Sequence, residues 1–167
     1  MAVDEHRAAA PRSVGCAVLT ISDTRDSDTD TSGQAIVDLL QQSGHHVLER
    51  RITKDEPADV ADTVRSFLSR DNVQAIVTTG GTGIARRDST YDALGAMFER
   101  TLPGFGELFR ALSYADIGAA AMLTRATAGI IERRAVFLLP GSEHAVRLAM
   151  TKLILPELGH VVRELMR

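Results

Sequence analysis

Two kinds of hydrophobic pattern alternate along the chain. Short, nearly continuous apolar runs rich in β-branched residues are typical of strands covered on both faces. Between most of them lie longer segments whose apolar residues recur every three or four positions, as on one face of a helix. This alternation predicts an α/β domain, a three-layer α/β/α sandwich with a mostly parallel sheet. The predicted strands are 15–21, 46–53, 73–78, 124–131 and 135–139.

The predicted helices carry recognisable start and stop signals. Thr31 and Gln34 have capping-box spacing, and Gly44 is placed to end the first helix. Pro57 suits the first turn of the second helix, and Pro156 is expected to break the helix near the C-terminus. The apolar residues expected to face the core are Val60, Val64, Phe67, Leu68, Tyr91, Leu94, Phe98, Leu108, Phe109, Leu112, Val146, Leu148, Ala149 and Leu153, with Ala119 to Leu123 as small-residue packing.

Length and composition narrow the class of protein. The 167 residues suit one domain, residues 14–167, preceded by a flexible N-terminal tail, residues 1–13, that lacks the pattern of a secretory signal. The apolar runs are too short to span a bilayer, so we expect a cytoplasmic location and no membrane partner. A net charge of −3 and 4% aromatic residues argue against binding to nucleic acid, because its phosphates attract basic surfaces.

The first candidate binding site follows the predicted strand 73–78. Gly80, Gly81 and Gly83 would allow backbone N–H groups to approach an anion closely, and Thr79 and Thr82 would add hydroxyl donors. Ligands of α/β sheets bind beyond the carboxyl ends of the strands, where these residues are expected. From the glycines alone, a tight strand-to-helix turn without a ligand is an equal alternative.

The residues after the glycines exclude two common phosphate loops. Ile84 stands where a P-loop requires lysine, and Arg86 stands where the dinucleotide fingerprint requires its third glycine. Arg86 and Arg87 could instead hold phosphates directly, with solvation at the surface as the alternative.

A second strand-to-helix connection, residues 140–142, follows the last predicted strand. Ser142 is the expected N-cap of the next helix, and beside Gly141 it could also donate to a phosphate, since a helix N-terminus favours negative charge. The acidic segment 26–30 does not match an EF-hand, because Leu39 stands where a bidentate glutamate is required. That segment is expected to cap a helix.

Five ordered segments carry a resemblance to a known family: ISDTRDSDTDTSG at 21–33, TKDE at 53–56, TTGGTG and ARRDST within 78–90, LPGFGELFRALS at 102–113, and LLPGS at 138–142. They resemble the molybdopterin-binding proteins of molybdenum cofactor biosynthesis, the MoaB/MogA family, whose members include molybdopterin adenylyltransferases. The resemblance covers roughly residues 13–160. It implies the molybdopterin-binding fold, in which a mixed sheet includes an antiparallel edge.

The resemblance implies an enzyme that uses Mg²⁺ to transfer AMP from ATP to molybdopterin, giving adenylyl-molybdopterin and pyrophosphate. Asp55 and Asp88 are the candidate catalytic residues and metal ligands, although each could also be an acid at a helix start. The alternative is a non-catalytic molybdopterin-binding or carrier protein. Segment 26–33 resembles the B branch of the family, in which competence for adenylation is not uniform, whereas ARRD and Asp55 resemble the catalytic branch.

Further ligand contacts and an assembly are also implied by the resemblance. Ser22 could instead be a strand-end hydroxyl that bonds backbone, and Arg125 could either face ligand or form a salt bridge at the sheet edge. The family implies a homotrimer or homohexamer and leaves open a molybdate-insertion protein as a partner. The predicted residues for molybdopterin or nucleotide binding are Ser22, Thr79, Gly80, Gly81, Thr82, Gly83, Arg86, Glu107, Ser113, Gly141 and Ser142.

Overall fold

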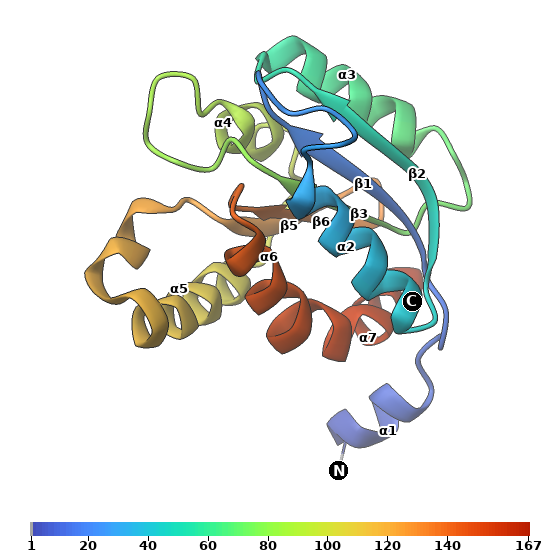
Figure 1. The fold of residues 1–167 in the computed structure, drawn as a ribbon. Coiled ribbons are helices and arrows are strands. Elements are labelled where there is room, and N and C mark those ends of the chain that lie inside the picture. The colour runs from blue at the N-terminus through green and yellow to red at the C-terminus, as the bar shows by residue number, and fades with distance from the viewer. Residues whose placement is uncertain (1) are drawn as a thin grey trace.

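The computed structural model describes residues 2–167, which form a six-stranded sheet between two layers of helices (Figure 1). The strands are β1 Gly15–Ile21, β2 His46–Thr53, β3 Ala75–Thr79, β4 Arg100–Thr101, β5 Thr127–Ile131 and β6 Arg134–Leu139. Their order in the sheet is β2-β1-β3-β6-β5-β4. Strands β2, β1, β3 and β6 are parallel to one another, and β5 runs antiparallel to both of its neighbours, β6 and β4. The predicted α/β/α class, with a mostly parallel mixed sheet and an antiparallel edge, is confirmed.

Helices from distant parts of the chain cover each face of the sheet (Figure 1). One face carries α2 Thr31–Gln42, α5 Pro103–Ile117, α6 Glu143–Ala149, the π-helical turn η2 Met150–Ile154 and α7 Leu155–Met166. The other face carries α3 Pro57–Leu68 and α4 Thr90–Gly95. Helix α1 Ala2–Ala8 packs on α7, and the 3₁₀ helix η1 Gly118–Leu123 follows α5.

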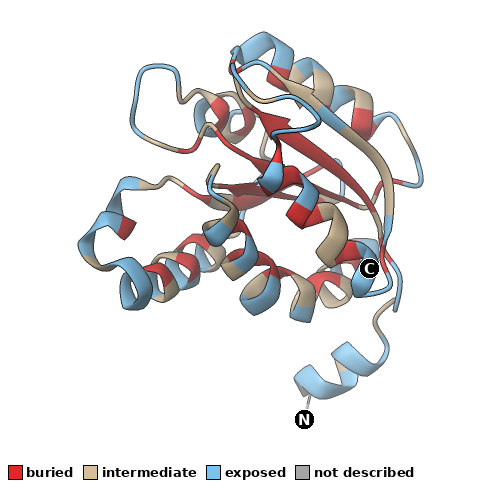
Figure 2. Ribbon diagram, in the orientation of Figure 1, coloured by how far each residue is buried: buried red, intermediate tan, exposed pale blue. Residues whose placement is uncertain are grey.

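The sheet is buried on both faces apart from its two edge strands, β2 and β4 (Figure 2). Because successive strand residues point to opposite faces, Val18 joins the core under α2 and α6, whereas Leu19 joins the core under α3. The α3 stripe is buried as predicted, and β2, which carries the charged residues Glu49, Arg50 and Arg51, lies at one edge of the sheet. Among residues 2–167, no helix combines the length and apolarity that crossing a bilayer requires.

The cap of α2 differs from the prediction. Asp30, rather than Thr31, caps the helix, and its side chain accepts a hydrogen bond from the Gly33 amide. The Gln34 side chain does not reach back to the cap, because its amide bonds to Asp38 and Arg50. The choice of cap therefore depends on partners outside the helix.

Several residues predicted to face the core lie at the surface. Tyr91 is exposed because α4 ends at Gly95, and its ring packs against the guanidinium of Arg125 instead. Leu108 is exposed because α5 turns Phe109 toward the sheet. The small-residue segment 119–123 is also mostly exposed, with only Ala121 buried.

One expectation about the C-terminal region also changes. Pro156 lies in the first turn of α7, directly after η2, so the helical run changes its winding there instead of breaking. Within the segment predicted as a flexible tail, residues 2–8 form α1, and Arg7 pairs with Glu157 of α7. The domain boundary at residue 14 stays a prediction.

Candidate functional site

Parallel pairing of β3 with β6 brings the two glycine-containing connections together. Thr79 is paired with Leu139, so residues 80–89, which we call the first loop, leave the sheet beside residues 140–142, the second loop. The Gly80 amide donates to the Leu139 carbonyl at 3.0 Å, and the Thr79 hydroxyl donates to the Pro140 carbonyl at 2.8 Å. The two loops are far apart in the sequence, but the pairing of β3 with β6 places them side by side.

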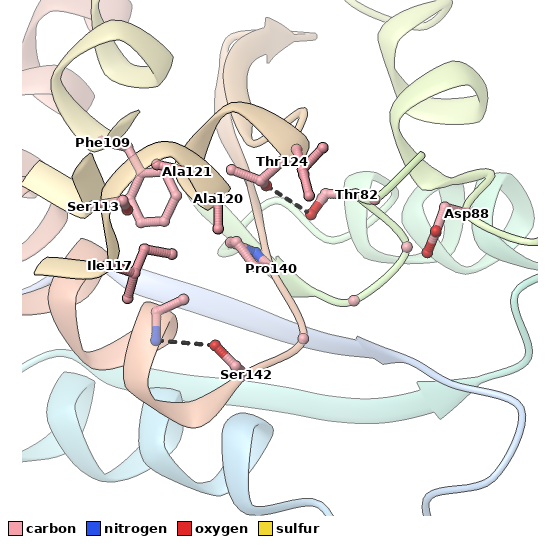
Figure 3. Close-up of a pocket in the computed structure, with 16 residues that line it drawn as sticks. Thr82, Asp88, Phe109, Ser113, Ile117, Ala120, Ala121, Thr124, Pro140 and Ser142 are labelled. Carbon is pink, nitrogen blue, oxygen red and sulfur yellow. Dashed lines mark hydrogen bonds between the residues drawn. The ribbon is translucent and has the colours of Figure 1, made fainter. Parts of the chain in front are cut away.

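A pocket of about 400 Å³ lies between the two loops, the end of α5 and η1 (Figure 3). This volume is in the range of small-molecule sites in proteins, roughly 300–1,000 Å³. In Figure 3, Phe109, Ser113 and Ile117 lie on one side of the pocket and Asp88 lies on the other. One wall is therefore largely apolar, and the opposite wall carries backbone and a carboxylate.

Most of the residues predicted from the two glycine segments line this pocket. Ser113, which comes from α5, joins them there and is buried. Five predicted residues do not line it: Ser22, Asp55, Thr79, Arg86 and Glu107. The predicted residues that line it are Gly80, Gly81, Thr82, Gly83, Asp88, Ser113, Gly141 and Ser142.

The first loop requires glycine at two positions. Gly80 and Gly81 have φ angles of 100° and 70°, in the region that side chains disfavour. A Cβ on Gly81 would lie 2.0 Å from the Thr90 hydroxyl oxygen, and a Cβ on Gly80 would lie 2.1 Å from the Ile21 carbonyl oxygen. The loop backbone is therefore pressed against its support, and its opposite side faces the pocket.

Asp55 and Asp88 lie against the first loop at neighbouring glycines. Asp55 is buried, and its Oδ1 accepts hydrogen bonds from the amide and hydroxyl of Ser89 at 3.2 and 2.6 Å. Its Oδ2 lies 3.1 Å from where a Cβ of Gly81 would be, and Oδ2 of Asp88 lies 2.6 Å from the equivalent point on Gly83. Asp88 Oδ2 also accepts from the Ala85 amide at 2.9 Å. Both acids therefore shape the loop as well as lying beside it.

Arg125 holds the first loop from outside the pocket. Its guanidinium donates to the carbonyls of Gly83 and Asp88 at 3.0 and 2.7 Å, and its amide donates to the Thr82 carbonyl at 2.8 Å. The same side chain pairs with Asp92. Of the two roles left open by the sequence, the salt bridge is present, and the contacts with the loop add a bracing role.

The adjacent residues Arg86 and Arg87 have different surroundings. Arg87 pairs with Asp23 and Glu56, and its hydrogen bonds hold the pKa of the Asp23 carboxyl below its ordinary value. Arg86 is exposed and makes no hydrogen bond or ion pair within residues 2–167. Its guanidinium is therefore free to meet an anionic ligand near the first loop.

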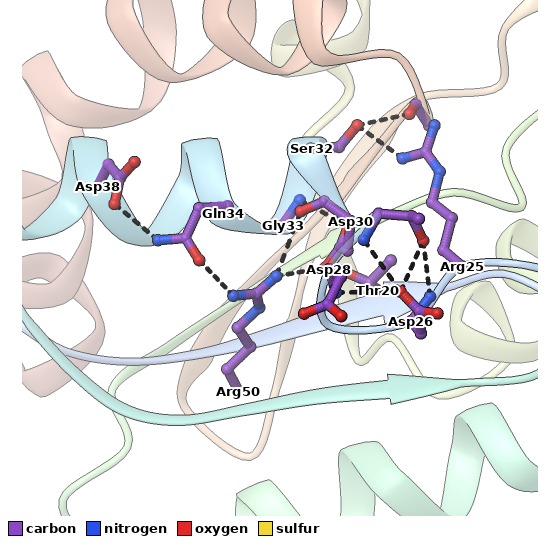
Figure 4. A network of polar contacts seen from close by, with 12 residues as sticks. Thr20, Arg25, Asp26, Asp28, Asp30, Ser32, Gly33, Gln34, Asp38 and Arg50 are labelled. Atoms are coloured by element: carbon purple, nitrogen blue, oxygen red, sulfur yellow. Dashed lines mark hydrogen bonds and ion pairs between the residues drawn. The ribbon is translucent and has the colours of Figure 1, made fainter.

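The second loop rests on the first turn of α2, which follows the acidic segment 26–30 (Figure 4). The Ser32 hydroxyl donates to the Gly141 carbonyl at 2.7 Å and accepts from Arg25 at 2.9 Å. The Ser22 hydroxyl accepts from the amides of Thr24 and Arg25, so it occupies the backbone-bonding position considered from the sequence. Segment 22–32 thus supports the pocket without lining it.

Asp30 is the buried centre of the network in Figure 4. Burial opposes ionisation, but hydrogen bonds from Arg50, Thr20 and the Gly33 amide outweigh it and keep the pKa of Asp30 below its ordinary value. Because the carboxylate stays charged, it can cap α2 and anchor β2 at once.

The apolar wall was missed by sequence reasoning. Phe109 was assigned only to the core, and the segment after α5 was interpreted as internal packing, whereas both contribute to the pocket. An available signal was the run of small and apolar residues directly after a predicted helix, with no polar residue between 117 and 123. The missed lining residues are Phe109, Ile117, Ala120, Ala121, Leu123, Thr124, Pro140 and Ala145.

Comparison with known proteins places this geometry in a family context. A family model described as a probable molybdopterin binding domain matches residues 17–160. The chain is 50% identical to molybdenum cofactor biosynthesis protein B of Halalkalibacterium halodurans over 168 residues, which cover 100% of this chain and 99% of that protein.

Solved structures show the same similarity in three dimensions. A crystal structure of molybdenum cofactor biosynthesis protein B superposes with a TM-score of 0.91 at 49% identity, covering 95% of this chain and 99% of that one. The tungsten cofactor synthesizing protein MoaB from Pyrococcus furiosus superposes with a TM-score of 0.84 at 37% identity, covering 95% of this chain and 100% of that one.

Proposed function

The chain belongs to the family of the probable molybdopterin binding domain, together with proteins of molybdenum cofactor biosynthesis, and on this basis we propose that it is a molybdopterin adenylyltransferase. It would transfer AMP from ATP to molybdopterin and release pyrophosphate. The observation that carries this proposal is the pocket between the two glycine loops, with Asp88 in its wall and Asp55 directly behind Gly81.

The pocket has the parts that a phosphorylated pterin needs. Phe109 and Ile117 supply an apolar wall for a flat ring system, while Gly81 and Gly83 bring backbone close to the opposite side. Ser142 lies at the N-terminus of α6, where it can meet a phosphate oxygen, although its own oxygen already accepts from the Ala145 amide at 3.2 Å. The fit is therefore to a ligand with an apolar body and an anionic end.

The two acids fit a magnesium site shared with substrate. Asp55 Oδ2 and Asp88 Oδ1 have no hydrogen-bond donor within residues 2–167, so each carboxylate has one uncommitted oxygen. Mg²⁺ prefers oxygen ligands and is often held by one or two carboxylates together with substrate phosphates. When bound there, Mg²⁺ would offset negative charge on the ATP phosphates.

The proposed reaction is an in-line displacement at phosphorus. A terminal phosphate oxygen of molybdopterin attacks the α-phosphorus of ATP, and a new P–O bond forms as the bond to the bridging oxygen breaks. Pyrophosphate leaves with that electron pair. The chain's own contribution would be to position the two anions, with Gly81 and Ser142 in the pocket wall and Arg86 elsewhere on the first loop, because bringing reactants into line removes much of the entropic barrier.

The decisive experiment mixes purified protein with molybdopterin, ATP and Mg²⁺ and measures pyrophosphate together with adenylylated pterin. Formation of both products in equal amounts supports the enzyme. Tight pterin binding without either product would select the carrier alternative. Binding of neither pterin nor ATP would overturn both the enzyme and the carrier hypotheses. Asp59→Asn is a suitable control variant, since Asp59 is exposed on α3 and does not line the pocket.

We also propose the homotrimer or homohexamer implied by the family resemblance. Support comes from the large apolar side chains exposed on α5 and η1, among them Leu108, Tyr114 and Met122. Apolar residues gathered in this way are typical of surfaces that bind another protein. Light scattering at micromolar concentration tests the assembly, and a monomeric mass would contradict it.

A further inference from the structure

A second cluster of polar side chains lies away from the pocket, where α1 packs on α7. His6, His160 and Glu164 each offer a ligand atom, and these three atoms lie within 4.8 Å of one another. Within residues 2–167 this is the one group of three or more histidine, cysteine or acidic side chains that meets this criterion. None of the three residues takes part in the function proposed above.

The helices account for the convergence of these side chains. His160 and Glu164 are four residues apart on α7, so they lie on the same helix face. His6 comes from the last turn of α1, and its ring meets the His160 ring edge-on with centroids 5.8 Å apart. Residues at opposite ends of the sequence therefore converge on one surface point.

The distances suit a small divalent ion. Zinc bonds of roughly 2.0–2.2 Å to nitrogen and oxygen place tetrahedral ligands about 3.4 Å apart. His6 Nδ1 lies 3.5 Å from Glu164 Oε1. The wider limit of 4.8 Å for the whole group requires only a modest side-chain rotation, which is available because all three residues are at least partly exposed.

A carboxylate already orients one of the two imidazoles. His160 Nδ1 lies 2.9 Å from Oε2 of Glu157, which leaves Nε2 as the free ring nitrogen. Histidines that bind metal commonly bond a carboxylate through the other ring nitrogen, which fixes the ring and its tautomer. Glu157 also accepts from Arg7 of α1, and this hydrogen bond holds the pKa of Glu157 below its ordinary value. Glu157 therefore links the same two helices.

The ligand types narrow the choice of ion. Two imidazoles with one carboxylate favour Zn²⁺ and its transition-metal neighbours, whereas Mg²⁺ and Ca²⁺ prefer oxygen alone. Arg163 donates to Glu164 Oε1 at 3.2 Å, and Arg167 donates to both carboxylate oxygens, at 3.4 Å to Oε1 and 3.2 Å to Oε2, so a cation must displace these contacts to bind Glu164. We propose that His6, His160 and Glu164 form a Zn²⁺ site that fastens α1 to α7, with water completing the coordination.

Calorimetry with Zn²⁺ on the full chain tests this site directly. We expect one ion per chain, and at least a tenfold weaker affinity in both His6→Ala and His160→Ala. His144→Ala is the matched control, because His144 pairs with Asp116 away from the cluster and should leave zinc affinity unchanged. Circular dichroism before titration establishes that each variant is folded.

Two further readouts separate a built site from loose binding at the surface. Co²⁺ in place of Zn²⁺ should give the visible absorption of a tetrahedral site in the parent and in His144→Ala, and lose it in His160→Ala. Zn²⁺ should also slow amide exchange in α1 of the parent, and it should not do so in His160→Ala. No zinc binding by the parent at millimolar concentration, or equal binding by the parent and both histidine variants, would overturn the proposal.

Discussion

The two loops that meet at the pocket are held in different ways. The first loop has ten residues, and charged side chains brace it: Arg125 from just before β5, Asp55 from beyond β2, and Asp88 from within the loop. The second loop has three residues and is fixed by uncharged hydroxyl donors, Ser32 and Thr79, on its carbonyl groups. One loop therefore carries the charges of the site, and the other provides a neutral floor.

Because the two loops are held differently, we expect the two sides of the pocket to have different roles. Charged side chains that brace a loop can also bind an anionic ligand or a cation. Asp55 and Asp88 each keep one carboxylate oxygen that accepts no hydrogen bond within residues 2–167. The hydrogen bonds from hydroxyl groups to the carbonyls of the second loop carry no charge to bind an ion, but they hold that loop in place at the start of α6. We therefore expect loss of a charge at the first loop to change chemistry and binding, and loss of the Ser142 hydroxyl in the second loop to change mainly stability.

The largest expected effect is that of Gly81→Ala. Alanine at a φ of 70° costs about 1–2 kcal/mol, and a methyl group 2.0 Å from the Thr90 oxygen adds about 1–3 kcal/mol of overpacking. The summed loss of about 2–5 kcal/mol should lower the melting temperature by roughly 4–20 °C, since 1 kcal/mol corresponds to about 2–4 °C at this size. Calorimetric melting measures the change.

Gly141→Ala is the matched substitution in the second loop. The φ angle of Gly141 does not lie in the positive region. A methyl group added there would lie 3.6 Å from the nearest atom, Gly80 Cα, which is an ordinary contact distance. We expect its melting temperature to stay within about 2 °C of the parent, which is under 1 kcal/mol. An equal loss in both variants would show that the two loops are not supported differently.

The next largest effect concerns Asp55→Asn and Asp88→Asn. Asparagine keeps a side-chain oxygen for the Ser89 or Ala85 donor, but it removes the negative charge that would hold Mg²⁺. Losing one preorganised electrostatic contact costs about 3 kcal/mol, so adenylation should fall on the order of a hundredfold or more. Pyrophosphate release at saturating ATP measures the rate.

These variants should retain the fold and the affinity for pterin. Melting temperature and pterin binding are therefore measured beside the rate, with Asp59→Asn as a control that keeps parental turnover. If both acid variants turned over like the parent, the metal site would be wrong. If both unfolded instead, the acids would be structural and the case for catalysis would rest on the glycine loops.

A smaller effect is expected from Arg86→Ala. Its free guanidinium can form a charge-assisted bond with a phosphate, so its loss should weaken ATP or pterin binding by roughly tenfold and leave the melting temperature unchanged. Arg87→Ala is the neighbouring comparison, because Arg87 already pairs with Asp23 and Glu56. Equal affinities for Arg86→Ala and the parent in equilibrium titration would remove Arg86 from the site.

The sequence predicted the glycine side of the pocket because that side follows from local rules. A buried strand followed by glycines and a second strand followed by Gly141 and Ser142 bring these residues together if the strands pair in parallel, and β3 and β6 do. Apart from Thr124, the polar residues that line the pocket could be named in advance, Ser113 from the family resemblance among them.

The remaining parts of the site depend on contacts that no local pattern encodes. Arg125 braces Gly83 from 42 residues away, and Asp30 caps α2 because Arg50 of β2 meets it. The apolar wall depends on how α5 turns as it passes into η1, which decides that Phe109 faces inward and Leu108 outward. Such choices are made by tertiary packing, and spacing along one helix allows either outcome.

The smallest expected effect, and the sharpest check on the neutral floor, is that of Ser142→Ala. Ser142 caps α6 by accepting from the Ala145 amide, and losing such a cap costs about 1 kcal/mol, or roughly 2–4 °C in melting temperature. Ser142→Asn should restore the melting temperature, because asparagine is an equally good cap. If Ser142 only supports the second loop, both variants bind pterin like the parent in equilibrium titration. If its hydroxyl also donates to the phosphate, Ser142→Asn recovers stability without recovering affinity, and the second loop would then share directly in binding.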